Sequence, residues 1–154
     1  MEKEIRFLTS KDLPAALALV EHVFMLYEAP DYTQEGVQEF LSFISLPRIQ
    51  QKLQQKEMFF LGCFTENILS AVLGFTPPGH INLLFTHEKF FRQGIARRLL
   101  SKIENFAKEE YAAPYLTVNA SPYAIEAYKR LGFLPTDVIK TVNGITFLPM
   151  QKTI

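Results

Sequence analysis

The chain has 154 residues, of which 48% are hydrophobic and 14 are phenylalanine. It can therefore bury the core of one domain without disulfides or a structural metal ion. Its 16 basic residues balance 16 acidic ones. This neutral balance argues against a global field that recruits nucleic acid or an anionic membrane surface. We therefore expect a single domain over residues 1–154, with neither nucleic acid nor membrane as a partner.

The apolar segments, the cysteine and the histidines of the sequence bear on its location and on metal binding. No apolar run reaches the length of a membrane span, and the first residues, Met-Glu-Lys-Glu-Ile-Arg, lack the apolar core of a signal peptide. We expect a cytoplasmic protein. The single cysteine, Cys63, lies in the apolar run 58–64, which favours a buried structural thiol. The three histidines are scattered in sequence, so no metal site is expected.

The hydrophobic periodicity predicts alternating strands and helices. Strands are expected at 4–8, 58–64, 69–75, 81–85, 115–119, 138–142 and 145–150. Helices are expected from about Pro14 to Tyr27, from a Thr33 cap to an interruption at Pro47, in a short piece around Ile49 and Leu53, from Gly94 through Ala107, and from Pro122 to a stop at Gly132. The order predicts an α/β sandwich around a mixed, mostly antiparallel sheet of six or seven strands, flanked by about four helices, with one parallel crossover.

The segment 80–98 reads as a buried strand, a polar loop and the start of an amphipathic helix, with Gly94 and Ala96 in the helix's first turn. A helix start presents unpaired N–H groups and partial positive charge, and phosphates bind there readily. Arg92, Arg97 and Arg98 add charge around the same turn. The same spacing is also typical of close helix packing, so this motif alone leaves a pyrophosphate cradle and a plain helix start as alternatives. A P-loop and a dinucleotide fingerprint are excluded, because their glycine patterns are missing.

This element order, the 86–98 loop and the segment Tyr128-Lys-Arg-Leu-Gly-Phe133 resemble the GNAT superfamily of N-acetyltransferases over nearly the whole chain. The family's pyrophosphate motif, Gln/Arg-x-x-Gly-x-Gly/Ala, falls on residues 91–96. Its glycine and alanine match, whereas Phe91 in the first position cannot donate a side-chain hydrogen bond. The resemblance implies that the strand before the loop splays away from the strand at 115–119.

The resemblance implies acetyl-CoA as cosubstrate, with the pantetheine arm in that gap, hydrogen-bonded to a strand edge much like an added strand. The implied cofactor-binding residues lie at the strand end, in the loop, and around the start of the last helix: Leu84, Phe85, Thr86, Phe91, Arg92, Gln93, Gly94, Ile95, Ala96, Arg97, Asn119 and Ser121. Family members often carry an asparagine at the place of Ser121, and Asn119 is a candidate to replace it. Family members also often dimerise, so a homodimer is possible.

Two residues are candidates for the catalytic chemistry. Acetyl transfer to an amine needs a base for the ammonium and an acid for the thiolate leaving group. Tyr128 matches the position of the family's acid, and the alternative is a tyrosine that packs against Ile125 and Leu131. His80 lies eleven residues before Phe91, where several family members place a base. The alternative is a solvated histidine that follows a Pro-Pro-Gly turn.

The acceptor pocket is expected around the break after the first helix. In the family this region contacts the acceptor, which implies substrate-binding roles for Glu28, Asp31 and Tyr32, and strand alternation places Asn82 on one face with His80 and Leu84. Glu28 or Asp31 could attract a cationic amine or act as the base, although a solvated loop is a more common explanation. The sequence thus predicts an acetyl-CoA-dependent N-acetyltransferase that acts on a primary amine of a small molecule or protein by direct attack in a ternary complex. A non-catalytic acyl-CoA sensor, and an interaction domain without CoA affinity, are the alternatives.

Overall fold

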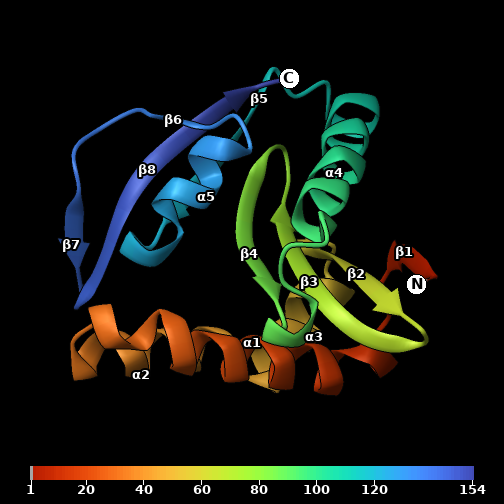
Figure 1. Ribbon diagram of the computed structural model, residues 1–154, viewed down its shortest axis with the longest axis horizontal. Helices are drawn as coiled ribbons and strands as arrows, with labels where there is room; N and C mark the ends of the chain where they lie inside the picture. Colours follow the sequence, from red (N-terminus) through yellow and green to blue (C-terminus); the bar gives the residue numbers. More distant parts are fainter. Residues whose placement is uncertain (1) are drawn as a thin grey trace.

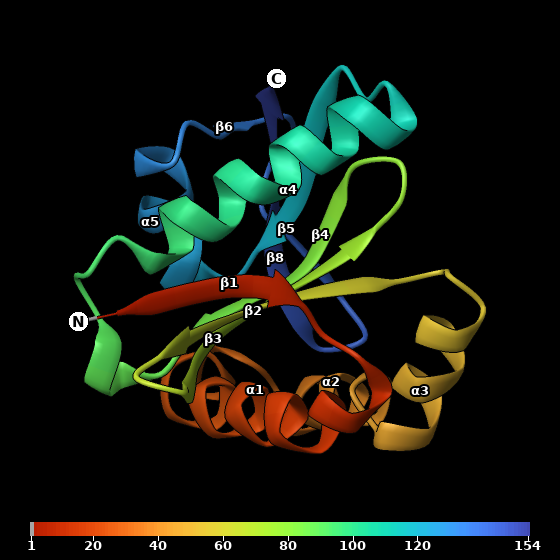
Figure 2. The same ribbon diagram turned by 90° about the vertical axis from the view of Figure 1, so that its right-hand side faces the viewer.

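A computed structural model describes residues 2–154 as helices packed on both faces of one mixed sheet (Figures 1 and 2). The strands are β1 (Lys3–Phe7), β2 (Phe59–Thr65), β3 (Ile68–Thr76), β4 (His80–Thr86), β5 (Tyr115–Ala120), β6 (Leu134–Pro135), β7 (Lys140–Val142) and β8 (Ile145–Thr153). The helices are α1 (Leu13–Tyr27), α2 (Gln34–Phe43), α3 (Leu46–Gln54), α4 (Ile95–Tyr111) and α5 (Ile125–Arg130), with short 3₁₀ turns η1 to η4 at Ser10–Asp12, Ala29–Asp31, Glu88–Phe90 and Pro122–Ala124.

The sheet order is β1-β2-β3-β4-β5-β8-β6, with β7 paired to β8, and all these pairs are antiparallel except β4 with β5. The predicted α/β class is confirmed. The described chain has eight strands rather than six or seven, because the two-residue β6 gives no periodic signal. It has five α-helices rather than about four, since the short piece after Pro47 is a complete helix.

Two apolar cores lie on opposite faces of the sheet. One contains the apolar sides of α1 and α3, and the other lies under α4 and the turn that follows α5 (Figure 2). Cys63 is fully buried in the second core, as predicted. Among residues 2–154, none of the helices combines the length and the apolar character needed to cross a bilayer.

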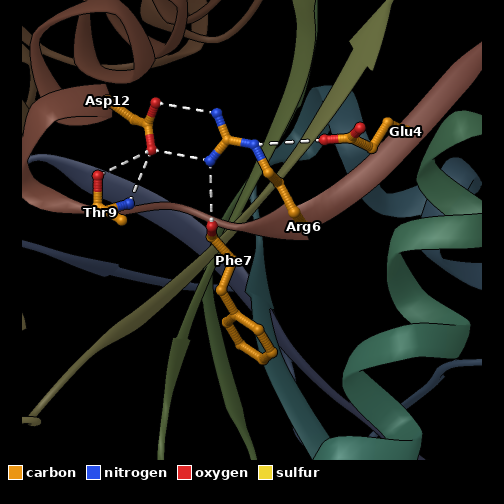
Figure 3. A network of polar contacts seen from close by, with 5 residues as sticks. All are labelled: Glu4, Arg6, Phe7, Thr9 and Asp12. Atoms are coloured by element: carbon orange, nitrogen blue, oxygen red, sulfur yellow. Dashed lines mark hydrogen bonds and ion pairs between the residues drawn. The ribbon is translucent and has the colours of Figure 1, made fainter.

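A polar clasp joins β1 to the start of α1 (Figure 3). Arg6 donates to both carboxylate oxygens of Asp12 over 3.0 and 3.2 Å, and the same carboxylate accepts from the amide and the hydroxyl of Thr9. Mainly through the Arg6 hydrogen bond, and also through the Thr9 amide, these contacts lower the pKa of Asp12 to about 2. The Arg6 guanidinium also lies 4.3 Å from the centre of the Phe64 ring. This clasp fixes the angle at which the chain enters α1.

A β-bulge lies in the middle of β4. The register shifts so that Ile81 pairs with Phe75 while Leu83 pairs with Gly74, which leaves Asn82 as the extra residue. Because the bulge reverses the alternation, Ile81 and Leu83 lie in cores on opposite faces of the sheet. The expectation that His80 and Leu84 share one face is therefore wrong.

The splay of the central strands is confirmed. Strands β4 and β5 pair only at His80 with Thr117 and at Ile81 with Val118, and then they diverge. In the described chain, the edge of β4 over residues 82–86 thus has no strand beside it on the β5 side. Such an edge offers backbone donors and acceptors to an extended ligand.

The tip of the β7–β8 hairpin closes the far end of this gap by contacting α2. Asn143 and Gly144 have φ values of 52° and 79°, as a two-residue type I′ turn requires. The Gly144 carbonyl accepts from the Thr33 amide over 3.2 Å, and a Cβ on Gly36 would collide with that carbonyl. The hairpin tip therefore rests on the first turn of α2, whose Thr33 cap is confirmed.

Candidate active site

Two adjoining cavities lie around the splayed strands. The larger has a volume of about 500 Å³ and is lined by the end of β4, the loop before α4, the first turn of α4, and α5. The smaller has a volume of about 200 Å³ and is lined by the start of β4, the break after α1, α2, and the end of β5. The residues that line both are Glu28, Leu84, Phe85, Ala124 and Tyr128. The two cavities therefore meet between the C-terminal end of α1 and the side of α5.

The loop at the mouth of the larger cavity has a backbone suited to an anion. Arg92 and Gly94 have φ values of 62° and 73°, and Gly94 caps α4 at its N-terminus. When residues in the left-handed backbone conformation alternate with residues in a right-handed one, successive N–H groups point into one concavity. The helix dipole adds positive potential there. A Cβ on Gly94 would meet no atom within 4 Å, so the glycine is explained by its φ and by the open space beside it.

Three side chains of this loop have different surroundings. Gln93 holds a buried Oε1 atom that has no hydrogen-bond partner within residues 2–154. Arg97 donates to the carbonyl of Arg130 over 3.0 Å, which ties the first turn of α4 to the end of α5. Arg92 is exposed at the mouth of the cavity. The predicted phosphate-binding residues 91–97 thus all line one cavity, with the side chain of Arg97 occupied by a structural contact.

Phe91 belongs to an aromatic row that the sequence analysis missed. Its ring lies 5.6 Å from that of Tyr27, which in turn stacks on Tyr123 at 5.2 Å. Phe91 and Tyr123 line the larger cavity, and both rings are exposed. At the first motif position the chain therefore offers an apolar face instead of a hydrogen-bond donor. No regular spacing connects these three residues, so the row is visible only in the fold.

Tyr128 lies at the junction of the two cavities. Its ring packs edge-on against Phe133 with centroids 5.4 Å apart, and no hydrogen bond within the described chain involves its hydroxyl. Burial, together with the charge of Glu28, raises the pKa of the phenol above its usual value. Tyr128 is therefore a protonated donor at neutral pH, and the packing role and the acid role are compatible.

Glu28 follows the last turn of α1 and lines both cavities. The pKa of its carboxyl group is raised to about 7, mainly by burial and also by the charge of Asp31, while the Ser121 hydroxyl opposes the shift. Ser121 Oγ approaches this carboxyl without a hydrogen bond of standard geometry and is itself a buried atom without a partner in residues 2–154. A carboxyl group with a pKa close to the working pH suits proton transfer.

His80 lines only the smaller cavity. Its Nδ1 atom is 2.7 Å from the Thr117 hydroxyl, and burial lowers its pKa below the ordinary histidine value. Asn82 also lines this cavity, and its Oδ1 atom accepts from the Thr76 hydroxyl over 2.6 Å. His80 is thus a neutral, oriented imidazole at neutral pH.

The other predicted residues divide between the two cavities. Tyr32, Asn119 and Ser121 line the smaller one, although the last two were expected to contact the cofactor. Thr86 lines the larger one. Asp31 is exposed and lines neither. The smaller cavity also has apolar walls that were not predicted individually, and these are Phe40, Phe43 and Ile145.

The fold and the site define a class of protein: an α/β domain in which a glycine-capped helix start lies beside two strands that diverge. Comparison with known families identifies that class. The family model of the acetyltransferase (GNAT) domain matches residues 28–154. The chain therefore belongs to the GNAT acetyltransferase family, and the resemblance that the sequence indicated is confirmed.

Solved structures share this fold at low sequence identity. A GCN5-related N-acetyltransferase from Rhodopseudomonas palustris has a TM-score of 0.85 at 19% identity, over 100% of this chain and 97% of that one. The PaiA N-acetyltransferase from Thermoplasma acidophilum, in complex with coenzyme A, has a TM-score of 0.80 at 18% identity, over 100% of both chains. A chimera of the spermidine N-acetyltransferase from Vibrio cholerae has a TM-score of 0.68 at 12% identity, over 99% and 96%. No curated protein matches the sequence.

Proposed function

We propose that this protein is an acetyl-CoA-dependent N-acetyltransferase that transfers the acetyl group to a primary amine by direct attack in a ternary complex. One observation carries the proposal: two adjoining cavities meet at a junction whose lining includes Glu28 and Tyr128. Such an arrangement allows donor and acceptor to be bound at the same time, with a candidate base and a candidate acid at the place where they touch.

The larger cavity is suited to the cosubstrate. The N–H groups of residues 92–96 would bind the pyrophosphate, and the buried Gln93 carbonyl oxygen would gain a partner if a donor of the ligand reached it. The open edge of β4 at residues 84–86 would pair with the amides of the pantetheine arm. The similarity to the PaiA structure that holds coenzyme A supports this assignment.

Glu28 is our candidate for the base. A primary amine arrives as an ammonium ion and must lose a proton before its nitrogen can attack the thioester carbonyl. Glu28 lines both cavities and so lies where donor and acceptor would meet, whereas His80 lines only the smaller cavity, to which we assign the acceptor. We assign His80 the role of orienting the acceptor through Nε2, since Nδ1 is held by Thr117.

Tyr128 is our candidate for the acid. As the new C–N bond forms, the C–S bond breaks and the sulfur leaves as a thiolate, which needs a proton. The raised pKa keeps the phenol protonated at neutral pH, so its hydroxyl proton is available to the departing thiolate. The products are then the N-acetylated amine and the free thiol of CoA.

The proposal covers the rest of the chain as well. We propose that residues 1–154 act as one domain, because α1 places Glu28 at the site while β8 supplies Ile145 to the same cavity. A cytoplasmic location, the absence of nucleic-acid and membrane partners, and a homodimer stay as predictions from the sequence.

The test is a calorimetric titration of acetyl-CoA, with dephospho-CoA and adenosine diphosphate as controls, followed by a thiol-release assay against a panel of amines. Cys63 is fully buried, so the chain adds little background to a thiol reagent. Binding that requires the pantetheine arm, together with acetylated product, supports the proposal. Binding without product from any amine favours the acyl-CoA sensor, and no binding overturns the proposal.

A further inference from the structure

A histidine–carboxylate cluster lies outside both cavities. His22 is an exposed residue of α1, and His87 and Glu88 are in the loop that leaves β4. This loop runs beside α1 (Figures 1 and 2). His22 Nε2 is 2.8 Å from one carboxylate oxygen of Glu88, and His87 Nδ1 is 3.3 Å from the other. His22 precedes His87 by 65 positions and Glu88 by 66, so the sequence spacing gave no sign of the cluster.

The three donors lie within reach of one ion. One ligand atom from each residue lies within 4.8 Å of the others, and a tetrahedral ion with bonds of about 2.0–2.1 Å places its ligands roughly 3.3 Å apart. Two of the contacts already have nearly this length. The imidazole rings stack with centroids 5.0 Å apart and an interplanar angle of 13°, so one ring must turn about its side-chain bonds before both nitrogens point at one ion.

The charge of the cluster also suits a cation. Among residues 2–154, the Glu88 carboxylate lies beside these two histidines and pairs with neither lysine nor arginine. The His22 contact holds the Glu88 carboxyl group in its ionised form by lowering its pKa. Two imidazoles and one carboxylate are a donor set preferred by late first-row ions over Mg²⁺.

We propose that His22, His87 and Glu88 bind a divalent transition-metal ion such as Zn²⁺ at three positions, with the remaining position open to water. The ion takes the place of the hydrogen bond between His22 Nε2 and Glu88, and it displaces the Lys89 amide hydrogen bond that His87 Nδ1 now accepts over 3.1 Å. Binding would tie α1 to the loop that leads into residues 91–96. The role we assign to the ion is to hold that loop in place, and no chemical step is assigned to it.

The test is a calorimetric titration of the CoA-free protein with ZnCl₂ at pH 7.5, because the thiol of CoA binds zinc itself. We expect one site with a dissociation constant of about 10 μM or lower, release of protons on binding, and no response to MgCl₂. His22→Ala and Glu88→Gln should each weaken zinc at least about tenfold. Both residues are at the surface, and circular dichroism of each variant checks its folding.

His80→Gln is the matched control, since it removes the third histidine of the chain and leaves the cluster intact. Unchanged zinc affinity in this variant supports the proposal. The proposal is overturned if wild-type protein binds no zinc below about 100 μM, if His22→Ala binds as well as wild type, or if His80→Gln is the variant that loses binding. Hydrogen exchange of residues 87–94 should slow when zinc is added, and unchanged exchange would remove the proposed effect on the loop.

Discussion

The two ends of α1 each hold a carboxylate, and the two carboxylates have opposite surroundings. Asp12 is the N-cap residue, where the helix dipole favours a negative charge, and it accepts hydrogen bonds from Arg6 and Thr9. Glu28 follows the last turn, where the dipole disfavours the charge and no standard hydrogen bond within residues 2–154 satisfies it. The pKa is about 2 for Asp12 and about 7 for Glu28.

The contrast separates groups that stabilise the fold from groups that are available to a ligand. At Asp12 every polar partner is supplied by the chain itself, so nothing is left for a substrate. At the other end of the same helix, Glu28, Ser121 Oγ and the Tyr128 hydroxyl lie close together with unused hydrogen-bonding capacity. Unsatisfied buried polar groups cost free energy in the empty protein, and a ligand that completes them recovers it.

The largest expected effect is on Glu28. Glu28→Gln should lower kcat by about 10²–10³-fold, because the amide cannot take a proton from the ammonium. In wild type the rate should rise with pH through about 7, where the carboxyl group ionises, and this limb should be absent from the variant. Steady-state rates measured from pH 5.5 to 9 check both expectations.

Asp31→Asn is the control for that experiment, since Asp31 is an exposed acid three residues away that lines neither cavity. We expect a rate within about threefold of wild type and a limb displaced slightly to lower pH, because the Asp31 charge contributes to the raised pKa of Glu28. A wild-type rate in Glu28→Gln would remove Glu28 from the mechanism.

Tyr128→Phe should lower kcat by about 10–100-fold while the affinity for acetyl-CoA stays within about twofold. The phenyl ring keeps the contact with Phe133, so only the proton donor is lost. Tyr123→Phe is the matched control, because Tyr123 lines the larger cavity without reaching the smaller one. Equal loss of activity in both variants would indicate a general effect of the hydroxyl groups on cofactor binding.

His80 is intermediate between the two carboxylates, because one ring nitrogen has a partner and the other is free for a ligand. His80→Gln should therefore raise KM for the acceptor and lower kcat by less than about tenfold, and the limb near pH 7 should persist. Loss of that limb in His80→Gln, with its retention in Glu28→Gln, would reverse the two assignments and make His80 the base.

The sequence predicted those parts of the fold and site that depend on local patterns. The helix start at Gly94, the Thr33 cap and the Asn143-Gly144 turn each depend on a few neighbouring residues, and each is confirmed. The β4 bulge depends on the register with β3, so strand alternation alone placed His80 and Leu84 wrongly on one face. The row of Phe91 and its aromatic neighbours, and the pairing of His22 with Glu88, depend on contacts between segments distant in sequence.

The most direct test of the contrast is the dependence of stability on pH. Asp12→Asn should lower the free energy of unfolding by about 1 kcal/mol at pH 7, through weaker contacts to Arg6 and Thr9, with activity retained. A depressed pKa contributes stability above the unfolded value of about 3.8, and this contribution is lost as the pH falls through about 2. Denaturant unfolding should therefore show the difference between the two proteins at pH 5–7 and its disappearance near pH 2.

Glu28 should show the opposite dependence, because its pKa is raised on folding. Below the unfolded value of about 4.5 the group is protonated in both states and has no effect, and the penalty for burying its charge grows until the pH passes about 7. Glu28→Gln should accordingly be as stable as wild type at pH 4 and more stable by about 1–3 kcal/mol at pH 8. Equal stability at both pH values would mean that the chain satisfies this carboxylate as fully as it satisfies Asp12, and the two ends of α1 would then be alike.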